Sequence, residues 1–319
     1  MRRHLLTRIG SGVLVLLLAS IVVFVALRLV PGDPARVIAG TDAAPDTIAA
    51  VRAQLGLDHS LVYQYWHWLG NVLRLDFGTS YVIGGPIGSL IGHGVANTLV
   101  LTVTAVVVAV ALSLVASIAW VVRPRRWLDA VLGTLVTVSI AVPPFVSGVL
   151  LVLVFAVLLP VLPASGIPPE GYFASLDITA QYLVLPATCL ALPVVAALTR
   201  FLSEALRREW RQPYVLTARA LGTPARRILT RGALRNALPT FLTVLGLQTG
   251  ALLSGAVLVE AIFAWPGLGQ LLTQSVGARD YPVVQALVLL SVAVFVVIQI
   301  VTDVAHAFLD PRVRLEGRP

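Results

Sequence analysis

The chain has 319 residues, of which 58% are hydrophobic and 12% are charged, and its net charge is +8. A soluble protein of this length has no interior large enough to bury so much apolar surface, so the composition predicts a polytopic membrane protein whose basic excess reflects topology rather than nucleic-acid binding. All 23 basic residues are arginine, which excludes a P-loop lysine or a Schiff-base lysine in this chain.

The first predicted element is an apolar run over residues 9–30. The basic residues before it resemble the start of a secretory signal, but the run is about twice as long as a signal-peptide core and no small-x-small cleavage site follows it. We therefore expect residues 1–30 to comprise a cytoplasmic N-terminus and a retained first transmembrane helix.

A polar excursion over residues 31–94 follows and is too long for a simple link. The rigid turn 31–34 (PGDP) leaves the membrane, residues 45–55 resemble a helix that Gly56 ends, and Ser60 can cap a second helix. The apolar face of this second helix comprises Leu61, Tyr65, Trp68, Leu69 and Val72. Its aromatic residues suit the membrane–water boundary, although partner binding is an alternative role. We expect a partly helical extracytoplasmic region.

Five further apolar stretches complete a set of six predicted spans, each near the roughly 20 residues that a bilayer requires. They cover residues 95–122, 129–159, 180–201, 237–262 and 283–307. The pair Pro143-Pro144 interrupts the third stretch, where we expect a kink. Short loops rich in proline and glycine, at 160–178 and 263–282, join the spans on the outer side.

Arginine placement predicts the orientation of these spans. Eighteen arginines fall on one side and five on the other. Because cytoplasmic loops carry the excess of basic residues, both termini are predicted to be cytoplasmic. The expected fold class is an all-α integral membrane protein with six transmembrane helices, in which residues 95–319 form a core domain of five spans.

The most distinctive stretch is the predicted cytoplasmic loop at 200–236. It holds nine arginines against two glutamates, a charge that cannot lie in hydrocarbon. Pro213 can open a helix and Gly222 can close it in the left-handed conformation. Thr223 and Pro224 are then the expected N-cap and first position of the next helix. On the first of these helices an apolar ridge is predicted at helical spacing, made of Val215, Ala218 and Leu221. Such a ridge on a cytoplasmic loop needs a docking partner.

Candidate catalytic chemistry is sparse. The five histidines share no metal-ligand spacing, and no hydrolase motif occurs. Cys189 is interpreted as a small core residue. Glu260 and Asp303 lie near the ends of spans, where a structural role in contact with headgroups or an arginine is preferred to a proton relay. A secondary transporter usually needs more interrupted helices or mid-membrane charges than this chain offers, which disfavours that class without removing it.

Several stretches together resemble one family, the integral membrane permease subunits of bacterial ABC importers in the dipeptide/oligopeptide and nickel branch. The resemblance covers nearly the whole chain and follows the family's order. The matching stretches are 24–34 (FVALRLVPGDP), 55–58 (LGLD), 63–66 (YQYW), 76–80 (DFGTS), 97–99 (NTL), 263–269 (FAWPGLG), 279–282 (RDYP) and 309–314 (LDPRVR).

The resemblance implies a role for the basic loop. In this family a cytoplasmic loop, often called the EAA loop, forms coupling helices that dock in a groove of the ATP-binding subunit. Residues 217–222 (TARALG) occupy that position here, and Thr217 stands where a glutamate might have been, so no ion pair is carried over. The implied ATPase-coupling residues are Pro213, Tyr214, Val215, Thr217, Ala218, Arg219, Leu221, Gly222, Thr223 and Pro224. The family signature also marks an outer or pore region at Pro31, Gly32, Asp33, Pro34, Trp265, Pro266, Gly267 and Asp280.

The family further implies a permease rather than an enzyme, in a bacterial cytoplasmic (inner) membrane. Its expected partners are a second homologous permease, two cytoplasmic subunits that bind ATP and Mg, an extracytoplasmic solute-binding protein, and membrane lipid. The expected solute is a di- or oligopeptide, with nickel, glutathione or another small solute as alternatives. Two other classes stay open from the residues alone: an ion-gradient-driven secondary transporter, and a structural or assembly protein.

Overall fold

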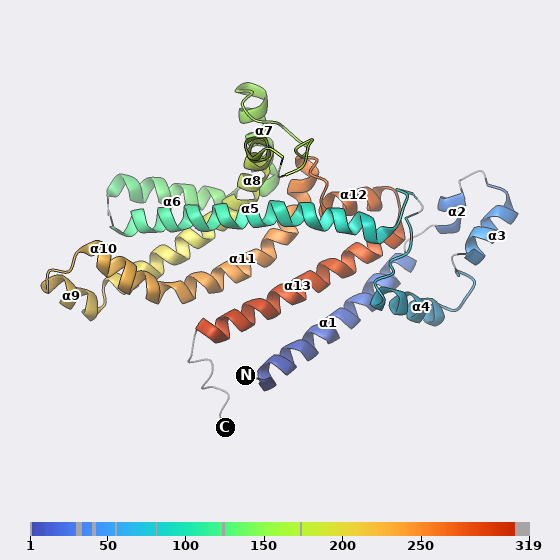
Figure 1. Ribbon diagram of the computed structural model, residues 1–319, viewed down its shortest axis with the longest axis horizontal. Helices are drawn as coiled ribbons and strands as arrows, with labels where there is room; N and C mark the ends of the chain where they lie inside the picture. The colour runs from blue at the N-terminus through green and yellow to red at the C-terminus, as the bar shows by residue number, and fades with distance from the viewer. Residues whose placement is uncertain are drawn as a thin grey trace. The chain divides into compact units, whose positions relative to one another are not determined.

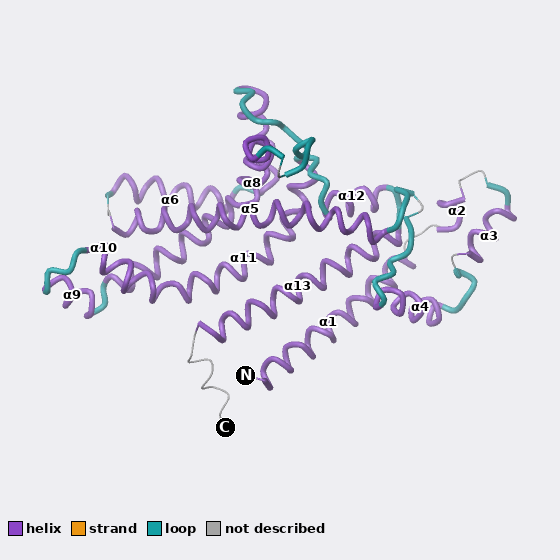
Figure 2. The backbone as a smooth tube through the Cα atoms, in the orientation of Figure 1, coloured by secondary structure: helices purple, strands orange, loops and turns teal. Residues whose placement is uncertain are grey.

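The computed structural model describes residues 2–29, 34–39, 43–54, 56–80, 82–122, 125–172 and 174–309. Over these ranges the chain is built from helices joined by loops, and no strand forms apart from an isolated bridge between Thr79 and Pro86 (Figure 1). Figure 2 shows helix and loop along the same backbone. Four of the described helices are long and apolar enough to cross a membrane, or up to six spans form if two bent helix pairs count as one span each. The predicted all-α class is confirmed, while the predicted orientation of the termini stays a prediction.

The chain divides into two compact units. One unit contains Met1–Asn97 and Pro266–Val297, and the other contains Thr98–Trp265 and Ile298–Pro319. Two long helices, α5 (Ile87–Val122) and α13 (Tyr281–Leu309), contribute residues to both. Segments far apart in sequence therefore share the core of the first unit.

The first unit opens with α1 (Arg2–Leu29), α2 (Pro34–Ala39), α3 (Pro45–Gln54) and α4 (Leu61–Leu73). The predicted end of α3 is confirmed, because Gly56 has φ +64° and Leu57 N donates to Arg52 O at 3.0 Å. The predicted cap of α4 is confirmed too, since Ser60 Oγ accepts from Tyr63 N at 3.4 Å.

The aromatic face of α4 packs on α1. Tyr65 and Trp68 lie 5.4 and 5.9 Å from Phe24 between ring centroids, and Tyr65 Oη lies 2.9 Å from Ser20 Oγ. Leu61 differs from the other residues of the predicted face because it is exposed in the first turn of the helix. The excursion after the first span is thus fastened to that span by aromatic packing.

The second long helix, α5, begins earlier than predicted. The sequence pattern places the start of this span at residue 95, but α5 begins at Ile87, inside the predicted outer region 31–94. Ile87 and Ile91 are buried against Val283 and Leu287 of α13, so tertiary packing supports helix in a stretch that is rich in glycine. Three glycines (88, 92 and 94) in those first turns had weakened the sequence signal.

The predicted kink in the third span is a sharp break. α6 (Arg126–Ala141) ends before the two prolines, and α7 (Pro144–Val152) with the π-helical segment η1 (Leu153–Leu158) continues at 108° to it. Val142 has ψ 121° and Pro143 has ψ 142°, the extended conformation that a following proline requires.

Cys189 packs at this break, which confirms its prediction as a core residue. It is fully buried, and its Sγ donates to Pro144 O at 3.3 Å. A Cβ added to Gly148 would lie 3.2 Å from the same sulfur. The small side chains of both residues let α7 approach α8 (Leu176–Trp210) closely.

The helix α8 extends beyond the predicted span 180–201 and into the predicted loop 200–236. Leu198, Leu202 and Leu206 lie on the buried face of α8, so the core packing continues past Arg200 to Trp210. After α9 (Pro213–Ala220), the chain runs without interruption through α10 (Ala225–Ile228), η2 (Leu229–Ala233, a π-helix) and α11 (Leu234–Ile262). Only residues 211–212 and 221–224 of the predicted loop are non-helical.

The predicted outer loop 263–282 contains a helix that the sequence analysis missed. This helix, α12 (Leu268–Gly277), follows Gly267. A Cβ added to Gly94 of α5 would lie 3.0 Å from Leu268 Cδ2, so this glycine lets the start of α12 pack closely on α5. In the other predicted outer loop, 160–178, the described residues are non-helical until α8 begins at Leu176.

Candidate functional site

The candidate site is the short helix α9 and the turns on either side of it, between α8 and α10 (Figure 1). Pro213 is the first residue of α9, where its missing N–H leaves no helical hydrogen bond unmade. Gly222 has φ +75°, and Thr223 N donates to Ala218 O at 2.9 Å across the end of the helix. The predicted start and stop of this helix are both confirmed.

The start of the next helix differs by one residue from the prediction. Pro224, rather than Thr223, occupies the cap position, with φ −64° and ψ 140°, and no side chain makes a capping hydrogen bond. The helix therefore begins at Ala225. Proline restricts the preceding residue to extended conformations, so Thr223 belongs to the turn.

The predicted apolar ridge is wrong at one of its three positions. Val215 is 0% exposed, so its side chain anchors α9 to the protein instead of facing a partner. Ala218 is half-buried. The aliphatic side chains that α9 and its following turn leave most exposed are Leu216, at 59%, and Leu221, at 79%, and the Tyr214 ring is 39% exposed.

A hydrogen-bonded cluster ties α9 to both neighbouring long helices. Tyr214 Oη donates to Glu209 Oε2 at 2.8 Å, and Asn236 Nδ2 donates to the same oxygen at 3.1 Å. Glu209 lies at the end of α8 and Asn236 at the start of α11, so one carboxylate connects three helices. Burial, followed by the hydrogen bond and charge of Glu209, raises the pKa of Tyr214 above its ordinary value of 10.0.

Close packing supports this cluster. A Cβ added to Gly232 of η2 would lie 3.2 Å from Tyr214 Cε2, so the tyrosine ring lies directly against the π-helical segment. The Arg219 guanidinium lies 5.1 Å from the centroid of the Trp210 ring, which connects the far end of α9 to the end of α8. Thr217 Oγ1 donates to Pro213 O of its own helix and makes no other hydrogen bond to a residue that the structure describes.

The structure therefore brings the predicted residues of α9 into one anchored projection. Its inner side is fixed by Tyr214 and Val215, and its outer side presents Leu216 and Leu221 among arginines. Such a surface can bury leucine side chains in an apolar groove of another protein, and a force applied to it reaches α8 and α11 through Glu209 and Asn236.

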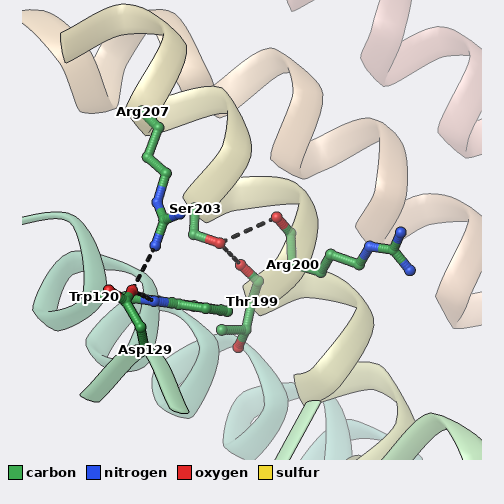
Figure 3. A network of polar contacts seen from close by, with 6 residues as sticks. All are labelled: Trp120, Asp129, Thr199, Arg200, Ser203 and Arg207. Atoms are coloured by element: carbon green, nitrogen blue, oxygen red, sulfur yellow. Dashed lines mark hydrogen bonds and ion pairs between the residues drawn. The ribbon is translucent and has the colours of Figure 1, made fainter. Parts of the chain in front are cut away.

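A second polar cluster lies beside this projection, where α5, α6 and α8 meet (Figure 3). Asp129 Oδ1 accepts from Arg207 Nη2 at 3.0 Å and from the indole N–H of Trp120. The Arg207 guanidinium also lies 4.9 Å from the Trp120 ring centroid. Further along α8, Ser203 Oγ donates to Thr199 O at 2.6 Å. The contacts of Asp129 hold the end of α8 from which α9 projects, while the Ser203 bond lies within α8 itself.

The structure describes five of the eight residues of the predicted outer signature, and among these five Trp265, Gly267 and Asp280 are buried whereas Pro266 is exposed. Pro31, Gly32 and Asp33 lie outside the described residues, and Pro34 begins α2. Trp265 is fully buried, Pro266 O accepts from Asn97 Nδ2 at 2.8 Å, and Gly267 precedes α12. The buried Asp280 accepts from Ser80 Oγ at 2.5 Å. This last contact joins two of the stretches on which the family resemblance rests, 76–80 and 279–282.

Glu260, one of the two acids predicted at membrane depth, lies inside the protein. Its side chain is 0% exposed and accepts from Thr98 Oγ1 at 2.6 Å. The side chain of Asp303 lies outside the described part of the structure. Among the described residues, no group of three or more His, Cys, Asp or Glu side chains could hold a metal ion.

Sequence reasoning missed four residues of the site. Leu216 was not included in the ridge, and Glu209, Asn236 and Gly232 were not connected with Tyr214. Glu209 is one of only two acids among nine arginines, which is a signal that could have marked it. The other three have no comparable signal, because their roles depend on how α9 folds back between α8 and α11.

Two family models match the sequence. Residues 109–315 match the model described as binding-protein-dependent transport system inner membrane component, and residues 1–85 match the model of the N-terminal part of such membrane components.

Curated relatives match over nearly the whole chain. The glutathione transport system permease protein GsiC of Salmonella choleraesuis (strain SC-B67) is 40% identical over 314 residues, covering 98% of this chain and 99% of the relative. GsiC of Escherichia coli (strain K12) is 38% identical with the same coverage. Among solved structures, an inward-facing conformation of the MetNI methionine ABC transporter matches with a TM-score of 0.51 and 18% identity, covering 69% of this chain and 96% of that chain. At this identity the structural match supports the fold alone.

Proposed function

The chain belongs to the family of inner membrane components of binding-protein-dependent transport systems. We propose that it transports a peptide-like solute and that an ATP-binding partner subunit drives this transport by moving α9. As a family member it is a permease subunit of an ABC importer in the bacterial inner membrane, and the ATP-binding chemistry resides in other subunits of such importers.

The proposed solute is glutathione or another short peptide. The relatives that match over 98% of the chain are named as glutathione permeases, and glutathione is itself a modified tripeptide. The predicted di- or oligopeptide class includes it. Nickel has less support, because the described residues offer no cluster that could bind a metal in transit.

The observation that carries the coupling proposal is the anchored projection of α9. Leu221 is 79% exposed and Leu216 is 59% exposed, although Val215 beside them is completely buried. A helix that is held firmly on one side and apolar on the other is suited to transmit movement from a partner. We assign the partner as a cytoplasmic ATP-binding subunit, whose closure on ATP would move α9 and, through Glu209 and Asn236, the ends of α8 and α11.

The remaining proposed partners follow from the family's dependence on a binding protein. A solute-binding protein would deliver the solute to the extracytoplasmic side, where the predicted excursion 31–94 would help to receive it. A second homologous permease would complete the pathway between two membrane subunits.

Copurification tests the coupling proposal. The full chain with a C-terminal tag is extracted in mild detergent, and the proteins recovered with it are identified by mass spectrometry. Leu221→Asp places a charge where a leucine would be buried, and burying a leucine contributes about 1.5–3 kcal/mol, so recovery of the ATP-binding subunits should fall at least tenfold. Leu73→Asp, at an equally exposed leucine that ends α4, is the matched control and should leave recovery unchanged. Equal recovery with both variants would contradict docking through α9.

Uptake into proteoliposomes tests the solute. The assembled complex with ATP inside and the binding protein outside should accumulate radiolabelled glutathione, and an excess of unlabelled dipeptide or nickel should compete less well than unlabelled glutathione. If a different competitor is accumulated instead of glutathione, the chain is still assigned to an importer, but the proposed solute is wrong. Uptake that requires an ion gradient and no ATP would overturn the coupling proposal itself.

A further inference from the structure

One face of the C-terminal end of α8 carries a stripe of charged side chains that neither the core nor α9 uses. These residues recur at helical spacing, so they share a face: Arg200, Glu204, Arg207, Arg208 and Arg211. All five are exposed, whereas Leu202 and Leu206 on the opposite face are buried. We call this set the α8 stripe. It has four positive charges against one negative charge.

Only part of the stripe is neutralised by contacts within the described chain. Arg207 pairs with Asp129 at 3.0 Å, and in Figure 3 the Arg200 side chain extends away from that pair. The guanidinium groups of Arg208 and Arg211 make no hydrogen bond or ion pair with any residue that the structure describes. Their positive charges are therefore available for an anion that the described residues do not supply.

A hollow of about 490 Å³ lies along the stripe. It is lined by Glu204, Arg207, Arg208, Arg211 and Gln212. This volume falls in the range of roughly 300–1,000 Å³ that small-molecule sites occupy. Arginine guanidinium groups that converge on one hollow can each bind a phosphate group by two parallel N–H···O bonds.

The depth of the stripe places it at the surface of the bilayer. A 35-residue helix such as α8 is about 52 Å long and exceeds the hydrocarbon core of about 30 Å, so one end lies outside it. Arg207 lies 4.9 Å from the ring of Trp120, near the end of α5, and Trp127 at the start of α6 is exposed. Tryptophan side chains in such positions mark the headgroup layer. The phosphates nearest to Arg208 and Arg211 are thus those of lipids.

We propose that the α8 stripe binds the phosphate of an anionic phospholipid, with Arg208 and Arg211 as its principal ligands. Arg207 is held by Asp129 and shapes the wall of the hollow, while Glu204 limits the site to one anionic group by repelling a second. Because Trp210 and Glu209 follow directly and hold α9, a lipid bound there stabilises the end of α8 from which α9 projects. Binding of the lipid therefore helps to hold the α9 projection in place.

The test compares two double variants of the full chain, purified with the subunits that accompany it. Arg208→Gln with Arg211→Gln removes the proposed ligands. Arg226→Gln with Arg227→Gln, at two exposed residues of α10, removes the same charge from a neighbouring helix and is the matched control. Each complex is placed in nanodiscs of phosphatidylcholine containing increasing fractions of phosphatidylglycerol, and the phosphatidylglycerol retained after re-extraction is counted by native mass spectrometry.

The expected result is a selective loss of anionic lipid. An arginine near an anionic membrane surface is worth about 1 kcal/mol, so each replaced ligand should lower retention about fivefold and the pair about 25-fold, with the control close to wild type. Equal retention by wild type and the stripe variant would overturn the proposal. So would loss of the ATP-binding subunits from the stripe variant with retention of the lipid, which would show a protein contact instead.

A further arm separates lipid from soluble anion. Inorganic phosphate is added to the wild-type complex in nanodiscs that contain phosphatidylglycerol, at concentrations up to those in cytoplasm. Unchanged lipid retention supports a lipid site, whereas displacement of the lipid by free phosphate would reassign the hollow to a soluble phosphate compound. Counting bound lipid does not require transport. The lipid proposal can therefore fail while the coupling proposal stands, and the coupling proposal can fail while the lipid proposal stands.

Discussion

Replacing Tyr214 by phenylalanine tests whether its hydroxyl holds α9 in place. The change removes the 2.8 Å bond to Glu209 Oε2 but keeps the ring against Gly232. Asn236 Nδ2 still donates to Glu209, so the carboxylate is not left without a partner. A hydrogen bond to a charged group contributes about 1.5–3 kcal/mol, and the partly exposed position of Tyr214 places this one at or below the lower end, at about 1 kcal/mol.

Hydrogen–deuterium exchange of the purified chain measures this change directly. A loss of about 1 kcal/mol in the free energy of local opening corresponds to roughly fivefold faster exchange of the amides in α9. The amides of α3 (Pro45–Gln54), which lie in the other unit, should exchange at the wild-type rate and serve as the internal control. Exchange in α9 that stays within twofold of wild type would refute the role given to the hydroxyl.

The same hydroxyl gives a prediction for alkaline pH. Burial and Glu209 raise the pKa of Tyr214 in the folded chain above its ordinary value of 10.0. A group with a raised folded-state pKa contributes stability that is fully present below its unfolded pKa and is lost as the pH rises through the folded pKa. The wild-type advantage over Tyr214→Phe in α9 protection should therefore be constant up to pH 10 and vanish above it. An advantage that declines near neutral pH would contradict this assignment.

Three further substitutions probe other parts of the structure. Gly222→Ala should cost about 1–2 kcal/mol of local stability in α9, measured by exchange, because φ is +75° while a Cβ there meets no atom within 4 Å; an unchanged rate would mean that the turn has another conformation. Gly148→Ala should lower thermal stability by about 1–3 kcal/mol through contact with the Cys189 sulfur, and Cys189→Ala in the same chain should recover part of that loss, whereas additive losses would contradict the contact. Ser80→Ala should lower the melting temperature, because the buried carboxylate of Asp280 would lose a hydrogen-bond donor at a cost of about 1–3 kcal/mol. A melting temperature equal to that of the wild type would show that the bond is not needed.

Much of the helical architecture could be predicted from local sequence. Long apolar runs predict spans because no soluble core could hold them, and the break at Pro143-Pro144 follows from the geometry that proline imposes on itself and on the residue before it. Pro213 and Gly222 marked the ends of α9 correctly, since both act through their own backbone conformation. Such signals need no knowledge of neighbouring elements.

Helix ends that depend on packing were predicted less well. Charge predicted that the fourth membrane span ends near Arg200 and gave no sign that the helix itself continues to Trp210, which it does because its opposite face stays buried along Leu202 and Leu206. The start of α5 at Ile87 and the existence of α12 have the same cause, namely burial against elements distant in sequence. A pattern of charges describes one face of a helix and leaves the other undetermined.

By itself, the sequence determined that this chain is an all-helical membrane protein and that the basic stretch around α9 is its most distinctive feature, because composition, prolines, glycines and arginines act locally. Only the tertiary structure decided which side chains of α9 are left exposed. Val215 and Leu221 have similar hydrophobicity and helical spacing, yet one is completely buried and the other largely exposed. That difference arises because Glu209 and Asn236, on two helices that meet only in the fold, fix the rotation of α9 through Tyr214.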